Sequence, residues 1–121
     1  MEKPTPAATK AFQDAFPDDA RAVKKKMFGM DAAFVNGNMF AGVFEKGVTL
    51  RLGKARVDAL LGEEGFYPFM PGGRTWPEYA IADADTWTGT EALSDWVLEA
   101  LEYTAKMPAK QEKPKKAKKP A

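Results

Sequence analysis

Two glycine-containing turns inside one apolar stretch, residues 27–52, constrain the fold more than any other feature of the sequence. The first is Asn36-Gly37, a dipeptide that favours a type I′ hairpin turn because both residues tolerate positive φ. For the second, Lys46-Gly47, we also predict a two-residue turn. Together they predict a three-stranded antiparallel meander with the following pairs: Phe34 with Met39, Ala32 with Ala41, Ala41 with Leu52, and Val43 with Leu50.

The two turns can be checked against each other, because side chains alternate between the two faces of a strand. Both registers give one wholly apolar face, the predicted core face, formed by Ala32, Phe34, Met39, Ala41, Val43, Leu50 and Leu52. The opposite face is mixed, and its interface candidates are Val35, Phe40, Phe44 and Arg51. Burial of one phenylalanine contributes about 2 kcal/mol, so we expect the two rings to be covered. The cover is either a helix of the same chain or a partner.

The remaining segments predict three helices and two further strands. A first helix is expected in residues 5–16, capped by Thr5 and ended by Pro17. A second is expected in 54–65 and a third in 88–106, where Thr88 and Glu91 match a capping box. Residues 66–71 and 75–82 are expected to form strands. The order helix, three strands, helix, two strands, helix predicts an α+β domain with a two-layer packing, an antiparallel sheet and helices mainly on one face.

The absence of two residue types limits the chemistry. The chain has neither Cys nor His, which excludes disulfides, thiolate zinc sites and the commonest general base. We therefore predict no catalytic residues, no metal site, no cofactor and no enzymatic activity. No apolar run reaches the length of a membrane span, and the first residues do not match a signal peptide. We expect a cytoplasmic protein that does not contact membranes.

The charge is divided unevenly along the chain. Residues 106–121 contain seven Lys and one Glu, whereas the rest carries a net negative charge. We predict an α+β domain in residues 1–107 and a disordered tail in 108–121, because the tail has no large apolar residue to bury. The lysines offered as nucleic-acid contacts are Lys113, Lys115, Lys116, Lys118 and Lys119. Phosphate neutralisation would be independent of sequence, and a solubilising tail is the alternative.

Several motifs together resemble a known family. Lys25, Lys26 and a Met-Phe-Gly at 27–29 are followed by the turn at Gly37 and a Met-Phe-Ala at 39–41. With "PFMPGG", "WPEYAIAD" and the last helix, this pattern over residues 8–107 resembles the N-terminal domain of the TfoX/Sxy competence-regulator family. The resemblance implies a two-layer α+β fold like that of secretion chaperones, and a regulatory role. It implies no catalytic residues.

Two hypotheses about function remain. In the first, the protein is a non-enzymatic binding or regulatory module, such as a homodimer, with an interface on the second sheet face and a tail that contacts nucleic acid. In the second, it is a small-molecule-binding domain or minor enzyme that uses the Trp, Tyr and Asp residues of the region 74–87. Trp96, by contrast, lies on the apolar stripe of the last predicted helix and is expected in the core.

Overall fold

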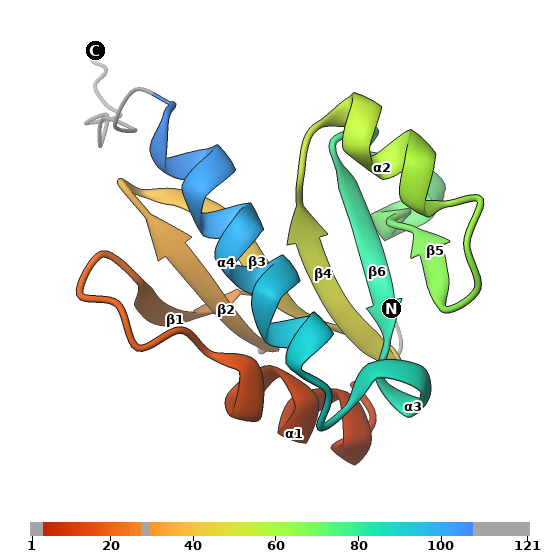
Figure 1. Cartoon of the computed structure of the whole chain (residues 1–121), viewed down its shortest axis with the longest axis horizontal. Helices are drawn as coiled ribbons and strands as arrows, with labels where there is room; N and C mark the ends of the chain where they lie inside the picture. The colour runs from red at the N-terminus through yellow and green to blue at the C-terminus, as the bar shows by residue number, and fades with distance from the viewer. Residues whose placement is uncertain (1–3, 28–29, 108–121) are drawn as a thin grey trace, which may run out of the picture.

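A six-stranded antiparallel sheet covered on one face by helices forms the domain (Figure 1). The computed structural model describes residues 4–27 and 30–107. The strands are β1 (Val23–Met27), β2 (Met30–Val35), β3 (Asn38–Phe44), β4 (Gly47–Arg51), β5 (Phe66–Pro68) and β6 (Tyr79–Asp83), in the sheet order β1-β2-β3-β4-β6-β5. The helices are α1 (Pro6–Ala15), α2 (Lys54–Leu60), α3 (Ala84–Trp87) and α4 (Glu91–Ala105), with a 3-10 turn η1 at Pro71–Gly73. The predicted two-layer α+β class is confirmed.

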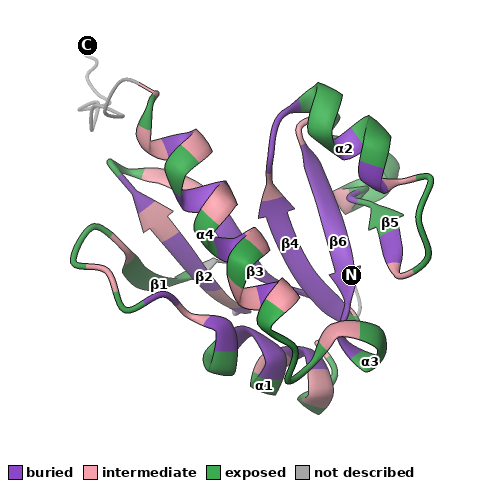
Figure 2. Ribbon diagram, in the orientation of Figure 1, coloured by how far each residue is buried: buried purple, intermediate pink, exposed green. Residues whose placement is uncertain are grey.

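The main core lies between the sheet and the helices. Figure 2 shows β4 and β6, which lie beside α4, buried along most of their length, and β3 is buried over most of its length as well. The largest fully buried apolar side chains in this core are Phe12, Phe40, Leu50, Leu93 and Leu101. We refer to this side as the helix face and to the opposite side as the second face.

Local sequence signals place α1 as predicted. Thr5 is its N-cap, and the Thr5 hydroxyl accepts a hydrogen bond of 3.1 Å from the Ala8 amide. Pro6 opens the helix, where the missing amide costs nothing. Phe16 is the C-cap, directly before Pro17. Both ends of the predicted first helix are therefore confirmed.

A β-bulge overturns part of the predicted sheet face. Asn36 and Gly37 both have positive φ, as the predicted turn requires, and Phe34 pairs with Met39. The register then shifts: Ala33 pairs with Ala41, so Phe40 is the extra residue on β3. One extra residue inverts the side-chain phase that the pairing would otherwise impose.

The inversion moves residues between faces. Val35 and Phe40, predicted on the second face, are 1% and 0% exposed and belong to the main core. Their assignment to an interface surface is therefore wrong. Ala32 and Met39, predicted on the core face, line a pocket on the second face, and the pairing places Phe34 on that face too. Ala41, Val43, Leu50 and Leu52 are in the main core as predicted.

The second turn lies one residue before its predicted position. Phe44 pairs with Gly47, so Glu45 and Lys46 form the turn, and Glu45 has a φ of 52°. Val43 consequently pairs with Val48 and Ala41 with Leu50, instead of Leu50 and Leu52. Gly47 serves another purpose. A Cβ on it would collide with the Ala82 carbonyl and the Ile81 side chain, so it permits β4 to lie close to β6.

Two further elements were not predicted. Residues 23–27 form the separate edge strand β1, paired with β2. Residues 84–87 form the short helix α3, whose N-cap Asp83 accepts from the amide and hydroxyl of Thr86. The N-cap of α4 is Thr90, whose hydroxyl accepts from the Leu93 amide, and not the predicted Thr88.

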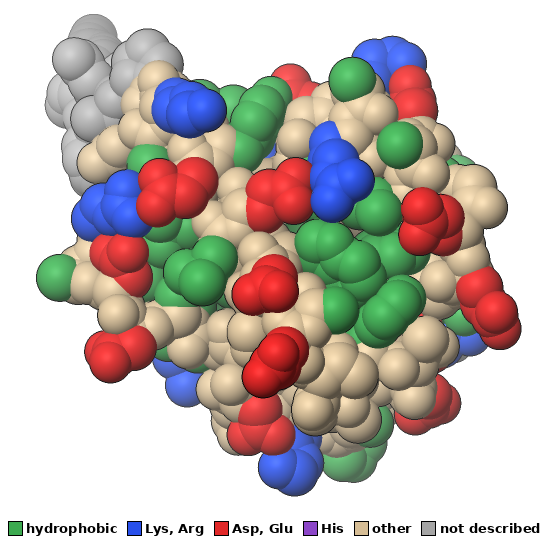
Figure 3. All heavy atoms as spheres, in the orientation of Figure 1, with side chains coloured by type: hydrophobic (Ala, Val, Ile, Leu, Met, Phe, Trp, Pro, Cys, Tyr) green, Lys and Arg blue, Asp and Glu red, His purple; other side chains and the backbone are tan. Residues whose placement is uncertain are grey.

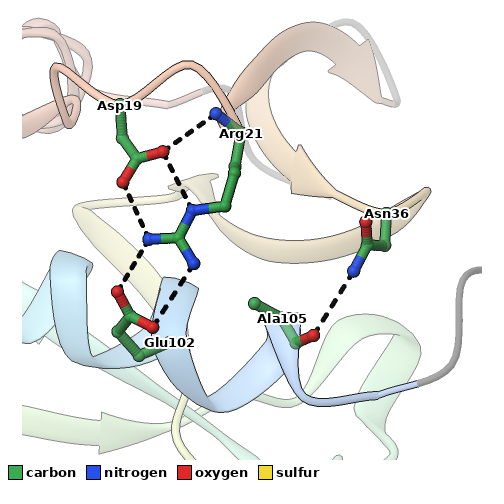
Figure 4. Close-up of polar contacts among 5 residues, drawn as sticks. All are labelled: Asp19, Arg21, Asn36, Glu102 and Ala105. Carbon is green, nitrogen blue, oxygen red and sulfur yellow. Dashed lines mark hydrogen bonds and ion pairs between the residues drawn. The ribbon is translucent and has the colours of Figure 1, made fainter.

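The C-terminal half of α4 is tied to two distant segments (Figure 4). The Arg21 guanidinium binds Asp19 at 2.8 Å and Glu102 of α4 at 2.7 Å. The Asn36 amide donates to the Ala105 carbonyl at 3.3 Å. The α1–β1 connection and the β2–β3 turn thus both hold the end of α4.

Candidate functional site

The second face is crossed by the segment between β5 and β6, residues 69–78, which we call the β5–β6 loop. The Trp76 amide donates to the Phe69 carbonyl at 2.9 Å and closes the loop. The Phe69 ring lies 4.8 Å from that of Phe44 on β3, at an interplanar angle of 82°. It also lies 5.3 Å from Trp76 and 5.4 Å from Tyr79. The ring contacts of Phe69 with Phe44 and Tyr79 attach the loop to the sheet.

Together these side chains form a second, smaller core. Met30, Phe44, Phe69, Tyr79 and Ile81 are buried in it, and Met39 packs against it. Phe44 is therefore covered, as the sequence required, but by the β5–β6 loop and not by a helix. Of the four interface candidates, Phe44 and Arg51 lie on the second face. Their role as an interface stays a prediction.

A pocket of about 300 Å³ lies beside this cluster. Its floor is the sheet itself at Ala32, Gly42 and Thr49. Met30, Phe44 and Phe69 form walls, while Pro71, Gly72 and Trp76 of the β5–β6 loop overhang it. Nearly all of these groups are apolar, so the pocket offers a binding surface that water solvates poorly.

Gly42 makes the floor of the pocket. It pairs with Ala32 on one side and Thr49 on the other, and its φ lies outside the left-handed region. A Cβ built on it would meet Ala32 and the Asp31 carbonyl at 3.4 Å, which is ordinary contact. Glycine is therefore not required there by backbone conformation. A glycine inside a strand often marks a place where a ligand approaches the backbone.

Thr49 brings a polar group to the same floor. The residue is 1% exposed, and its hydroxyl has no hydrogen-bond partner among the described residues. An unsatisfied buried hydroxyl costs about 1–3 kcal/mol. Thr104 on α4 has a second such hydroxyl, but Thr104 does not line the pocket.

The charged groups near the pocket are paired with one another. Asp31 lines the pocket, and its carboxylate is held by Lys26 at 3.0 Å and Lys24 at 4.0 Å. Arg51 donates to Glu78 at 3.1 Å and lies 5.4 Å from the Tyr79 ring. Burial raises the pKa of the Tyr79 hydroxyl, which donates to the Met39 carbonyl at 3.4 Å.

Exposed apolar side chains adjoin the loop. Tyr67, Met70 and Trp76 are 38%, 44% and 38% exposed. Tyr67 and Met70 line a neighbouring hollow of about 330 Å³ on the other side of Phe44, where Lys46 lies 5.0 Å from the Tyr67 ring.

The aromatic residues proposed for a small-molecule site separate into two groups. Trp76 and Tyr79 join the cluster on the second face, and Trp76 lines the pocket. Trp87 and Trp96 meet edge to face, with ring centroids 4.6 Å apart, on the helix side, where both pack against the main core. Gly42, Thr49 and Phe69 were missed as pocket residues. Only the glycine within a predicted strand offered a signal for them.

The acidic residues of the same region do not gather. Asp83 caps α3 and Glu78 binds Arg51. Among residues 4–27 and 30–107, no group of three acidic side chains is placed to hold a metal ion. In the same ranges, no helix combines the length and apolar character needed to cross a bilayer.

The helix face is acidic along α4. Glu91, Asp95, Glu99 and Glu102 recur at helical spacing on its outer side, and Figure 3 shows carboxylates following this helix across the surface. Glu99 pairs with Arg56 at 2.8 Å. The five lysines proposed as nucleic-acid contacts, and the predicted disorder of residues 108–121, lie outside the described residues.

Comparison with protein families gives one match. The model of the TfoX N-terminal domain family matches residues 15–104, which span every strand of the sheet and α2 to α4. Neither the curated proteins nor the solved structures include a significant match.

Proposed function

Because the chain belongs to the TfoX N-terminal domain family, we propose that it is a non-enzymatic, cytoplasmic regulatory module that acts by binding. The second face of the sheet is its binding surface, and the pocket under the β5–β6 loop is the binding site. The observation that supports this proposal is the pocket itself, an apolar hollow of about 300 Å³ lined in part by Thr49, whose buried hydroxyl has no partner among the residues that the structure describes. This site unites the second sheet face of the binding-module hypothesis with Trp76 of the small-molecule hypothesis.

A screen of small fragments tests this proposal. In two-dimensional NMR spectra, apolar fragments are expected to shift the amide signals of Gly42 and Thr49 and the indole signal of Trp76. Gly42→Val adds a side chain to the pocket floor and is expected to abolish these shifts. Leu98→Ser, which changes an exposed apolar residue on α4, serves as the matched control and should leave them intact. Shifts spread evenly over the surface would contradict the proposal.

The same face is also proposed to mediate self-association or contact with a protein partner. The exposed side chains of Tyr67 and Met70 beside the pocket supply the apolar surface that such contacts use. If the protein is a homodimer through this face, Met70→Ser should shift its sedimentation toward the monomer, whereas Leu98→Ser should not. A monomer for the unaltered chain would contradict the homodimer.

Nucleic acid is the second candidate partner, through the tail. The observation that favours this assignment is the charge division between the acidic outer side of α4 and the Lys-rich residues 106–121. An acidic helix face repels a phosphate backbone, which favours the tail over this helix for contacts of this kind.

A further inference from the structure

We propose that the pocket under the β5–β6 loop binds a neutral aromatic molecule, of one or two fused rings, that carries one hydrogen-bonding group. The Thr49 hydroxyl is the residue that recognises this group. The inference rests on the proposed function, because it names the ligand class for the same surface.

The size of the pocket sets the first limit on the ligand. A volume of about 300 Å³ is at the lower end of the range for small-molecule pockets. The floor is formed by residues with little or no side chain, Ala32 and Gly42, which leave the sheet backbone exposed to the pocket. A compact, flat molecule fits such a floor.

The walls favour an aromatic ligand. Phe44, Phe69 and Trp76 already meet edge to face, with interplanar angles of 82° for both neighbouring pairs. A further ring placed among them gains the same kind of contact, because aromatic edges and faces carry opposite partial charges. The thioethers of Met30 and Met39, which also line the pocket, contact aromatic rings favourably.

The electrostatics favour a neutral ligand. Asp31 is the only ionisable residue among the described residues that line the pocket. Its carboxylate is already paired with Lys26 at 3.0 Å. A charged ligand would lose its hydration without gaining a counter-charge, which is strongly unfavourable.

The Thr49 hydroxyl supplies the single polar contact. Thr49 lines the pocket, and its buried hydroxyl has no partner among the described residues. A hydroxyl both donates and accepts hydrogen bonds, so it can bind a phenol-type hydroxyl or a ring N–H. Thr104 also has a buried hydroxyl without a partner among the described residues, but Thr104 does not line this pocket. The inference therefore depends on the position of Thr49.

Four probes of equal ring size test the ligand class: 2-naphthol, naphthalene, decahydro-2-naphthol and 2-naphthoate. Dissociation constants are measured by NMR titration, from the signals of Gly42, Thr49 and Trp76. We expect 2-naphthol to bind about fivefold more tightly than naphthalene, which is the effect of one neutral hydrogen bond. The non-aromatic and the charged probe are expected to bind at least tenfold more weakly than 2-naphthol.

Variants at Thr49 test the assigned contact. Thr49→Val should make 2-naphthol and naphthalene bind equally, whereas Thr49→Ser, which keeps the hydroxyl, should retain the preference. An unchanged preference in Thr49→Val would overturn the role of this residue. The amide spectrum of each variant shows whether the fold is preserved.

The outcomes separate this inference from the proposed function. If 2-naphthoate or decahydro-2-naphthol binds at the pocket as tightly as 2-naphthol, the ligand class is wrong, although the pocket remains a binding site. If no probe shifts the three signals and no fragment does so in the wider screen, both proposals fail.

Discussion

The two buried threonines allow the cost of an unpaired hydroxyl to be measured in one protein. Thr49 and Thr104 are 1% and 0% exposed, and neither hydroxyl has a partner among the described residues. Valine has nearly the same shape and no polar atom to leave unsatisfied. Replacing an unsatisfied polar group with an apolar group of the same shape is neutral or stabilising.

We therefore predict that Thr49→Val raises the melting temperature of the free protein. A gain of about 1 kcal/mol corresponds to a rise of roughly 4–8 °C in a domain of this size. Calorimetry of Thr49→Val and Thr104→Val would measure the effect at the pocket and in the main core. A lower melting temperature for Thr49→Val would show that the hydroxyl is satisfied in solution.

A second prediction at the scale of single residues concerns acid stability. Hydrogen bonds from Arg21 lower the pKa of Asp19 from 3.8 to about 2. Because the folded state holds this proton less tightly than the unfolded chain, the ion pair stabilises the protein fully above about pH 4. The stabilisation is lost as the pH falls from 4 toward 2.

Arg21→Gln and Asp19→Asn should each remove this contribution. Urea unfolding from pH 7 to pH 2 is expected to show a smaller loss of stability in acid for both variants than for the unaltered chain. Parallel pH profiles for all three proteins would refute the assignment to Asp19. Since both side chains are on the surface, added salt should reduce the difference.

At the scale of elements, the features set by neighbouring residues could be predicted from the sequence. The pairing between strands could be predicted only in part. The Asn36-Gly37 turn and the Thr5 cap depend on neighbouring residues, and both were predicted. The bulge at Phe40 depends on how β3 pairs with β2, which no local pattern encodes. One extra residue was enough to move Val35 and Phe40 from the predicted second face into the main core.

In the candidate site, too, individual residues could be singled out from the sequence, whereas the contacts between them could not be predicted. Phe44 and Trp76 were each singled out in the sequence, although for different reasons. Their meeting depends on Phe69, whose ring bridges them at 4.8 Å and 5.3 Å. The fold of the β5–β6 loop over the sheet is a tertiary contact between residues about thirty positions apart, and no periodic spacing in the sequence predicts such a contact.

At the scale of elements, we predict different effects on stability when each of two glycines within strands is changed to alanine. We expect Gly47→Ala to destabilise the protein by about 2 kcal/mol or more, because its Cβ would meet the backbone of Ala82, which cannot move without disturbing β6. Gly42→Ala has space for its methyl group and should leave stability unchanged or raise it by up to about 1 kcal/mol. Urea unfolding of both variants measures the difference, and equal stabilities would contradict it.

At the scale of the whole molecule, the main core and the candidate pocket lie on opposite faces of one sheet. The helix face contains the main core and presents the carboxylates of α4 (Figure 3). The second face is crossed by the β5–β6 loop with its short 3-10 turn η1, and it carries the pocket. Binding on the second face therefore leaves the packing of α1 and α4 against the sheet intact.

The basic residues after α4 supply the last prediction. If Lys113, Lys115, Lys116, Lys118 and Lys119 each neutralise a phosphate, the logarithm of the affinity for duplex DNA should fall with the logarithm of salt concentration, with a slope of about −4.5. Changing all five to Gln should abolish this binding, whereas changing them to Arg should retain it. Fluorescence anisotropy with an arbitrary duplex measures both. The acidic outer side of α4 offers no substitute surface, so equal affinity for the Gln variant would remove the tail from any role in binding nucleic acid.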